Sequence, residues 1–463
     1  MKKEGKPNMK RNRFTFGIGT IGRDMLYTLY SMYFIFFLTS VINVSTTDLA
    51  WITGILVVLR VFDAMINPVM GLIVDNTRTR FGRFKPWMAL GAISAGIFAV
   101  ILFLGPNMSG APFIILIAVS LFLFAVTYTI NDISYWSMLP SLSKDPKERE
   151  NIGSKARIFA LCGTFFVVAG IVPITTMLGG SENSPRGFFL FAILVVIIMW
   201  VGQLVTIFGV KEPKEVERPK EKLAIKQMFQ DMYHAIFKND QLLIVAISMA
   251  LFMIGYTTTV SFGIFYFESV FGNMNMYSIF AIILGISQIT SLLMFTVISK
   301  RLKRKTLYFY ATILVVVGYI IFFFAPTTTM LFIGIAGVLI FIGQAAIQLL
   351  MLLYLADTVE YGHWKLRKRN DSVTFSLQPF IFQIGGAVAS GIVGFTVIKS
   401  GIHQNAAGTL LHGEGLLIFK IAMFIIPLLC ILAGFILCHF KYKLDEEKYA
   451  EIIQDLKERG DIL

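Results

Sequence analysis

The sequence predicts an all-α membrane protein in which twelve transmembrane helices form two six-helix bundles. Three observations indicate this fold class. The 463 residues are 56% hydrophobic and have a mean hydropathy of +0.72, well above the values of soluble proteins. Twelve apolar stretches reach the ~20 residues that a helix needs to cross a bilayer. Basic residues gather in every second connection between these stretches, as expected of a chain that crosses the membrane repeatedly.

Each predicted span is an apolar run bounded by polar or turn-forming residues. The first, second, fourth, tenth and eleventh spans carry polar interruptions. The apolar run that opens the chain is too long for a secretory signal and lacks a small-residue cleavage pattern, so we expect it to remain as the first span. The predicted spans are 15–43, 48–73, 87–105, 112–139, 153–178, 187–210, 241–271, 276–299, 306–325, 329–357, 374–400 and 415–440.

Lysine and arginine mark one side of the predicted membrane. The connections DNTRTRFGRFKP (75–86) and SKRLKRK (299–305) are rich in them, whereas GPNMSGAP (105–112) has none. Basic connections stay on the cytoplasmic side, so we expect both termini to be cytoplasmic. The formal net charge of +13 therefore reflects orientation in the bilayer, and we expect no nucleic-acid partner.

The longest basic connection divides the chain into two sets of six spans. Short basic connections follow the second and the eighth span, at corresponding places in the halves, which is typical of transporters built from repeats. The C-terminal segment has helix-forming composition and charges of both signs, which favours a surface helix. The predicted parts are an N-terminal six-helix bundle (1–210), a cytoplasmic linker (211–240), a C-terminal six-helix bundle (241–440) and a cytoplasmic tail (441–463).

Cysteine, histidine and glutamate show no pattern of a catalytic or metal centre. Cys162, Cys430 and Cys438 lie in apolar runs without paired spacing, so we interpret them as small core residues. None of the five histidines lies in mid-span or at ligand spacing. We expect Glu268, near the outer end of the seventh span, to reach water. The sequence contains no recognisable pair of nucleophile and base, so we predict neither an enzyme nor a cofactor.

The second span contains charged residues in the stretch RVFDAMINPVMG. Arg60, Asp63 and Asn67 are three and four residues apart, so they share one face of a helix. A charge at the centre of a span costs at least ~2.5 kcal/mol on insertion scales and usually faces a polar cavity. The stretch therefore indicates a path for a solute or an ion, or else a salt bridge through Arg60 that only holds helices together.

The first span carries Arg23 and Asp24 in GIGTIGRD. Asp24 is either the partner of Arg60 in a charge pair or a hydrogen-bond acceptor for hydroxyl groups of a solute, and both roles are compatible. Three glycines precede it and thin the helix, so that another helix or a solute can approach closely. These glycines are Gly17, Gly19 and Gly22.

The fourth span places Asp132 and Trp136 one turn apart in TYTINDISYW, so a carboxylate and an aromatic ring share a face. A sugar ring offers an apolar C–H face for stacking and hydroxyl groups for acceptor oxygens, which fits this pair. Trp136 alone would more often be a packing residue. Arg157, at the start of the fifth span, is expected to satisfy Asp132, to face the ligand, or to lie in solvent.

Candidate ion ligands lie on the second and fourth spans. Sodium prefers hard oxygen ligands, which Asp63, the amide of Asn67 and the hydroxyl of Thr129 supply. A proton would need one carboxylate that can be protonated in the membrane, and Asp63 is the first candidate. The residues themselves do not choose between the two ions.

With these motifs the chain resembles the glycoside-pentoside-hexuronide:cation symporters of the major facilitator superfamily, in particular the bacterial melibiose carriers. The motifs are GIGTIGRD, RVFDAMINPVMG with TRTRFGRFKPW, TYTINDISYWSMLP, SKARIFA and LADTVEYGHWKL. The resemblance implies the major facilitator fold and a carrier in a bacterial cytoplasmic membrane. That carrier imports a sugar by alternating access together with a cation, H⁺ or Na⁺.

The resemblance also implies roles for single residues. A sugar pocket would be lined by Arg23, Asp24, Tyr128, Asp132, Trp136 and Arg157. A cation site would be formed by Asp63, Asn67 and Thr129. It implies as partners a sugar substrate and the lipid bilayer, and leaves the oligomeric state open.

Three positions depart from the family pattern. Asn67 replaces a carboxylate, Gln383 stands where the family has a lysine, and Gln348 stands where melibiose carriers have a tryptophan. Sodium coupling and melibiose itself are therefore less favoured, and proton coupling through Asp63 gains ground. The alternatives are an uncoupled sugar facilitator and a carrier of an amphipathic lipid on the same fold.

Overall fold

The structure is a computed structural model of a helical protein. It describes residues 9–77, 79–105, 108–142, 146–210, 237–299, 301–367, 371–402 and 410–459. Within these ranges twelve helices are long and apolar enough to cross a membrane, and no strand occurs, so the predicted fold class is confirmed. The predicted linker (211–240) lies outside the described residues except for its last four, so the predicted domain boundaries stay predictions.

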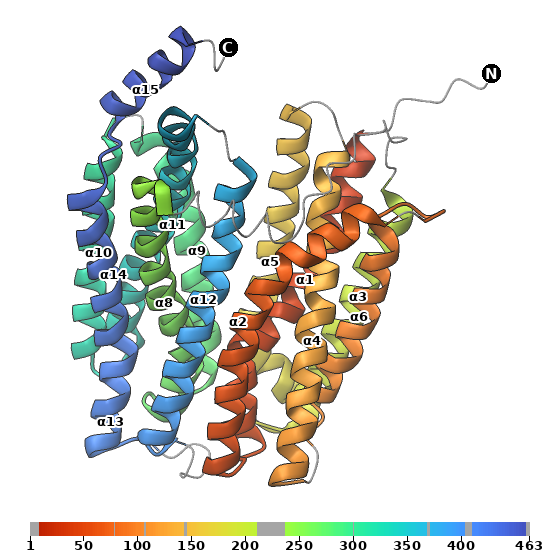
Figure 1. The fold of residues 1–463 in the computed structure, drawn as a ribbon. Coiled ribbons are helices and arrows are strands. Elements are labelled where there is room, and N and C mark those ends of the chain that lie inside the picture. Colours follow the sequence, from red (N-terminus) through yellow and green to blue (C-terminus); the bar gives the residue numbers. More distant parts are fainter. Residues whose placement is uncertain are drawn as a thin grey trace. The chain divides into compact units, whose positions relative to one another are not determined.

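The chain divides into two compact units, each of which forms a helical bundle (Figure 1). The first unit contains α1 (Met9–Phe36), α2 (Thr46–Asn76), α3 (Lys85–Leu102), α4 (Ala111–Met138), α5 (Pro146–Gly179) and α6 (Pro185–Gly209). The second contains α8 (Asp240–Ser269), α9 (Asn275–Ile298), α10 (Arg304–Phe324), α11 (Met330–Leu366), α12 (Asp371–Lys399), α13 (Gly413–Lys420), α14 (Ile426–Lys441) and α15 (Glu446–Glu458).

Helix α1 packs closely against α5 and α6 in the first unit. A Cβ atom on Gly22 would lie 2.3 Å from the backbone of Met199 on α6, and one on Gly17 would lie 2.4 Å from the ring of Phe159 on α5. The glycines of the first span therefore admit neighbouring helices rather than a solute, which decides between the two predicted roles. Small residues serve the same purpose at other helix contacts in membranes.

Replacing Gly22 by alanine should destabilise the first unit by about 1–3 kcal/mol, because the added methyl group meets backbone atoms that no side-chain rotation can move. Gly54 is the matched control, since it lies within α2 and a Cβ there would meet no atom of the described residues within 4 Å. Thermal unfolding in detergent, followed by loss of monodisperse protein, measures the difference. Equal midpoints for the two alanine variants would show that the close α1–α6 contact is not present.

Buried amides connect four helices of the first unit. Asn131 on α4 donates to the carbonyl oxygen of Met88 on α3 at 2.8 Å and to Gln203 Oε1 on α6 at 3.2 Å. Gln203 in turn donates to the carbonyl oxygen of Gly19 on α1 at 2.9 Å. Polar side chains inside a membrane protein find partners on other helices in this way. The network links α1 to α4 through Gln203 on α6, and α1 and α4 carry the charged cluster described below.

Ion pairs join helices in both units. In the second unit Arg304 on α10 pairs with Asp357 on α11, and Tyr442 donates to the same carboxylate at 3.3 Å. In the first unit Arg13 donates to both oxygens of Glu148. The guanidinium of Arg13 holds the pKa of Glu148 below its ordinary value, because it stabilises the charged carboxylate.

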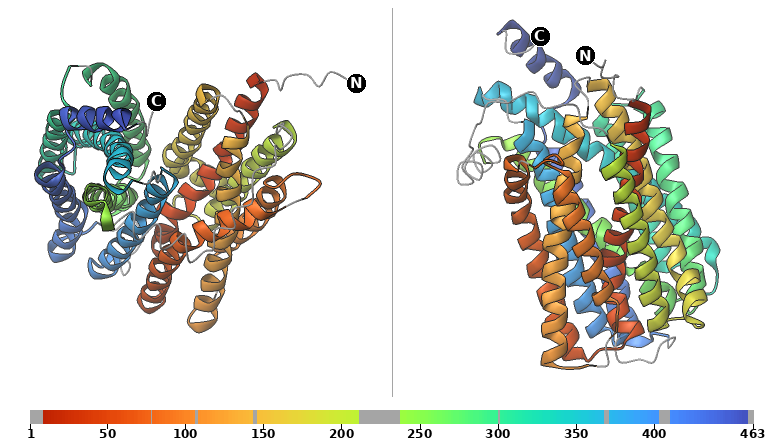
Figure 2. Two further views of the ribbon diagram at one scale, coloured as in Figure 1. Left: turned by 45° about the horizontal axis from the view of Figure 1, so that its top comes forward. Right: turned by 90° about the vertical axis from the view of Figure 1, so that its right-hand side faces the viewer.

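The predicted tail helix is confirmed as α15, which follows α14 at one end of the second unit (Figure 2). Ile452 and Leu456 are buried against the unit, and Asp455 accepts a hydrogen bond of 3.0 Å from the indole of Trp364 on α11. The apolar face of α15 therefore packs against the bundle of the second unit.

Two single-residue expectations are wrong. Glu268 is only 6% exposed and does not reach water, because the whole end of α8 is packed against its neighbours. Cys162 is exposed on α5 rather than a core residue, while Cys438 is buried as expected. Both errors arise because an apolar run does not reveal which of its faces meets another helix.

Candidate functional site

Arg23 is the centre of a charged cluster in the first unit. Its side chain is 2% exposed and lies 3.1 Å from Asp24 Oδ2 and 2.9 Å from Asp132 Oδ1. The carboxylates are more open than the cation, with side-chain exposures of 27% for Asp24 and 37% for Asp132. One buried guanidinium therefore pairs with two carboxylates that remain accessible to a ligand, and it offsets one of their two negative charges.

Aromatic rings support the guanidinium of Arg23. Its Cζ atom lies 4.7 Å from the centroid of the Tyr135 ring and 5.1 Å from that of the Trp136 ring, which are distances of cation–π contacts. The hydroxyl of Tyr128 donates to the carbonyl oxygen of Arg23 at 3.4 Å. Helices α1 and α4 thus bring together Arg23, Asp24, Tyr128, Asp132 and Trp136, five of the six residues predicted for a sugar site.

Arg60 has other partners than the sequence suggested. It donates to the carbonyl oxygen of Ser31 on α1 at 3.2 Å, and its guanidinium lies 5.6 Å from the ring centroid of Tyr30. The predicted charge pair of Arg60 with Asp24 is therefore wrong, since Arg23 is the cation that pairs with Asp24. Arg60 still holds α2 to α1, through a carbonyl oxygen and a ring.

The sixth predicted residue, Arg157, does not join the cluster. It is exposed on α5. The ion pair that the sequence suggested for it, with Asp132, is made by Arg23 instead. A contact of Arg157 with a sugar thus stays a prediction that rests on the family resemblance.

The predicted cation residues lie beside the charged cluster. Thr129 on α4 donates a hydrogen bond to the carboxylate of Asp63 on α2. Asn67 is partly buried one turn further along α2. Asp63 interacts electrostatically with both Asp132 and Arg60. Candidate sugar and cation residues therefore share helix α4, where Thr129 lies next to Tyr128 and one turn before Asp132.

Sequence reasoning missed two aromatic residues of this region, Tyr135 and Tyr27. Tyr135 stacks on Phe16 at a centroid distance of 4.5 Å and lies under Arg23. Tyr27 stacks on Tyr128 at 5.4 Å and is 36% exposed. The available signal for Tyr27 was its spacing of three residues from Asp24, which places both on one face of α1.

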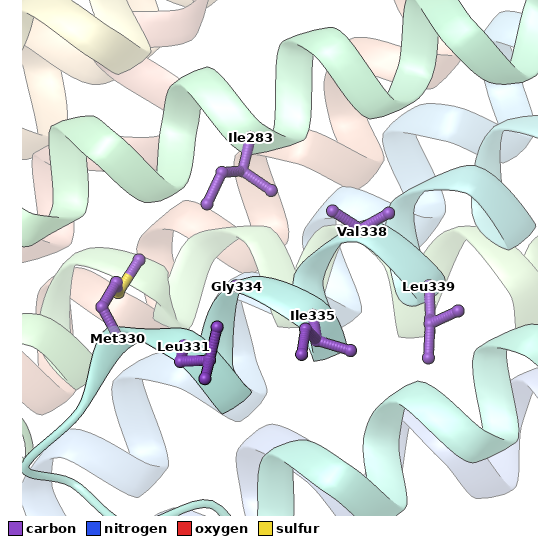
Figure 3. A pocket seen from close by; sticks show the side chains of 7 residues that line it. All are labelled: Ile283, Met330, Leu331, Gly334, Ile335, Val338 and Leu339. Carbon is purple, nitrogen blue, oxygen red and sulfur yellow. The ribbon is translucent and has the colours of Figure 1, made fainter.

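A separate hollow lies in the second unit between α9 and α11, with a volume of about 460 Å³ (Figure 3). Its lining is made of apolar residues, whose side chains include no group that could bind a hydroxyl. Gly334 forms part of it, and a Cβ there would lie 3.4 Å from Ile283. The lining residues are Ile283, Met330, Leu331, Gly334, Ile335, Val338 and Leu339.

Resident metal ions have no evident ligand set in the described parts of the chain, where no group of three or more His, Cys, Asp or Glu side chains is placed to hold one. The charged cluster consists of carboxylates paired with a guanidinium. Groups of this kind can bind a ligand through hydrogen bonds and charge.

Comparison with known proteins identifies the family. A family model described as MFS/sugar transport protein matches residues 15–446. The chain belongs to this family. The family predicted from the motifs is thereby confirmed, and the protein is a multi-pass membrane protein of sugar transport.

Several relatives in the family align over nearly the whole chain. The lactose permease of Leuconostoc lactis is 30% identical over 99% of this chain and 74% of its own length. The raffinose carrier protein of Pediococcus pentosaceus is 29% identical over 96% and 71%, respectively. The isoprimeverose transporter of Lactiplantibacillus pentosus is 25% identical over 85% and 81%.

Solved structures support the fold alone, since their sequences are distant. A crystal structure of the nucleoside transporter NupG has a TM-score of 0.61 at 15% identity and covers 93% of this chain and all of its own. A bacterial homologue of the human lysosomal transporter Spinster has a TM-score of 0.65 at 11% identity, covering 94% and 96%. The chain therefore shares its helical architecture with these distant transporters.

Proposed function

We propose that the protein is a secondary active transporter that imports a sugar by alternating access, coupled to the movement of a cation. The substrate class is a glycoside, pentoside or hexuronide, in agreement with the lactose, raffinose and isoprimeverose named for its relatives. The protein acts without covalent chemistry and without a bound cofactor, so we do not propose an enzymatic activity.

The observation that carries this proposal is the pairing of one buried Arg23 with two partly exposed carboxylates, Asp24 and Asp132. Carboxylates accept hydrogen bonds from several sugar hydroxyl groups, and bonds to charged acceptors are the stronger kind. Arg23 is within hydrogen-bonding distance of both and offsets one of their two negative charges, which lowers the cost of holding carboxylates inside a spanning bundle. The Trp136 ring beside them offers an apolar surface for the C–H face of a sugar.

We propose a proton as the coupling ion. Asp63 accepts a hydrogen bond from Thr129, and Asn67, one turn away, is a neutral amide. Of the three candidate cation residues, Asp63 alone is a carboxylic acid. A sodium ion would require more hard oxygen ligands, and the change of the family carboxylate to Asn67 weakens the set. Protonation of Asp63 would alter the electrostatic balance with Asp132 and Arg60, and this provides the physical link to sugar binding. Sodium coupling and uncoupled sugar transport are the alternatives.

We also propose that both termini face the cytoplasm of a bacterial cell. In the predicted topology both lie on the same side as the connections rich in lysine and arginine, and such connections remain in the cytoplasm. The amphipathic-lipid carrier is the remaining alternative function. The apolar hollow between α9 and α11 would accept an acyl chain. However, its lining residues provide no polar group for a lipid headgroup, so we favour the sugar.

Uptake into proteoliposomes that contain the purified protein tests the proposal. Lactose, raffinose and isoprimeverose are offered as labelled sugars, with an inward gradient of protons, of sodium, or of neither. We expect accumulation of at least one of these glycosides, driven by the proton gradient. Absence of both uptake and counterflow for every glycoside in the panel, together with movement of a labelled lysolipid, would favour the lipid carrier instead.

A further inference from the structure

We infer that Tyr27 is a specificity-determining residue that stacks one face of its ring against the sugar. This inference rests on the proposed sugar transport. It names a substrate contact that the motifs of the family did not indicate, on the helix that carries Arg23 and Asp24.

Among the described residues, the ring of Tyr27 is stacked on one side only. It lies 5.4 Å from the ring of Tyr128 with an angle of 26° between the planes, and the ring of Tyr128 is stacked in turn on Phe124 at 5.7 Å. Tyr128 is 9% exposed and Phe124 is 1% exposed, whereas Tyr27 is 36% exposed. Tyr27 is therefore the open end of an aromatic stack whose other members are fixed in the core of the first unit.

The electrostatic surroundings of Tyr27 distinguish it from an aromatic residue that meets lipid. It interacts electrostatically with Arg60, Asp63, Asp132 and Asp24. On α1 it lies one turn beyond Asp24 and one turn before Ser31, whose carbonyl oxygen binds Arg60. A bilayer would not be in contact with so many charges, because each costs several kcal/mol there. The exposed part of Tyr27 therefore faces the same polar surroundings as the two carboxylates.

The chemistry of this position matches a sugar ring. Ligand sites for small molecules combine aromatic surface with a few convergent polar groups. Asp24 and Asp132 supply acceptors for hydroxyl groups, and the open face of Tyr27 supplies a surface for C–H groups. The stack behind Tyr27 keeps the ring in place before the sugar binds, so little conformational entropy is lost on binding.

Three substitutions separate a contact of the Tyr27 ring with the sugar from a role of its hydroxyl group or a general effect of losing an aromatic ring. Tyr27→Phe keeps the ring and removes the hydroxyl, whereas Tyr27→Leu removes the ring and keeps a shorter apolar side chain. The matched control is Phe122→Leu, because Phe122 is 39% exposed on α4 and contacts Phe62 rather than the charged cluster. Counterflow of the sugar that wild-type protein transports is measured in proteoliposomes without an ion gradient, together with thermal stability in detergent.

We expect Tyr27→Leu to raise the half-saturation concentration at least tenfold with a maximal rate within about twofold of wild type. Tyr27→Phe should remain within threefold, and Phe122→Leu should be unchanged. A half-saturation concentration of Tyr27→Leu within twofold of wild type overturns the inference while the proposed function stands. The inference is also overturned if Tyr27→Leu loses sugar affinity together with thermal stability and Tyr27→Phe, which keeps the ring, loses affinity as well. If wild-type protein shows no counterflow with any glycoside, the proposed function fails, and the inference fails with it.

Discussion

Replacing Asp132 by asparagine should weaken sugar binding at least 100-fold while the protein remains folded in the membrane. Asparagine has nearly the same shape but carries no charge, so hydrogen bonds from sugar hydroxyl groups lose the contribution of a charged acceptor, about 1.5–3 kcal/mol for each bond. Arg23 also loses one of its two carboxylate partners. Isothermal titration of the purified variant with the transported glycoside measures the loss.

The control for Asp132→Asn is Glu451→Gln, which removes an exposed carboxylate of α15 that pairs with Lys448 at 2.8 Å. We expect this control to bind sugar as wild type does, because surface ion pairs contribute little. Wild-type affinity in a well-folded Asp132→Asn protein would remove Asp132 from the sugar site.

Replacing Asp63 by asparagine should abolish accumulation of sugar against its gradient and leave counterflow largely intact. The carboxylate that receives the hydrogen bond of Thr129 is lost, so this position can no longer take up and release a proton. Asparagine resembles the protonated, uncharged form of Asp63, and the carboxylates that we propose as sugar contacts, Asp24 and Asp132, remain in place. Labelled-sugar uptake with an imposed proton gradient, compared with counterflow in the same vesicles, separates the two effects.

The complementary change is Asn67→Asp, which restores a second carboxylate one turn from Asp63 and should create or strengthen stimulation of uptake by sodium. Uptake of this variant is measured over a series of sodium concentrations at constant ionic strength. An unaltered sodium response in Asn67→Asp, or full accumulation by Asp63→Asn, would contradict the placing of the cation on α2 and α4.

Most of the fold could be predicted because a membrane-spanning helix can be recognised from its own segment of the sequence. Length, hydropathy and the distribution of basic residues can be read within one segment, and the structure has helices at all twelve predicted places. The tail helix α15 was predictable for the same reason, since its helix-forming composition and its charges of both signs can be read within one segment.

Candidate site residues within one helix could also be predicted, whereas their partners could not. Asp132 and Trp136 share a face of α4 by spacing alone. The choice of Arg23 rather than Arg60 as the partner of Asp24 depends on how α1, α2 and α4 pack. That packing depends on contacts such as Gly22 against Met199, which lie far apart in the sequence.

Positions near the ends of the predicted spans were the least predictable. Glu268 is buried although it lies near the outer end of its span, and Arg157 is exposed without joining Asp132. In both cases the local sequence is compatible with either environment. The packing of neighbouring helices decides, and sequence spacing carries no record of it.

An experimental structure of the protein with a transported glycoside bound, at a resolution that shows the sugar ring, tests most directly whether the cluster around Arg23 is the binding site. We predict sugar hydroxyl groups within hydrogen-bonding distance of both Asp24 and Asp132, with the ring against an aromatic side chain of the cluster. A glycoside bound elsewhere, while Arg23 still joins two carboxylates that contact no sugar, would contradict this assignment.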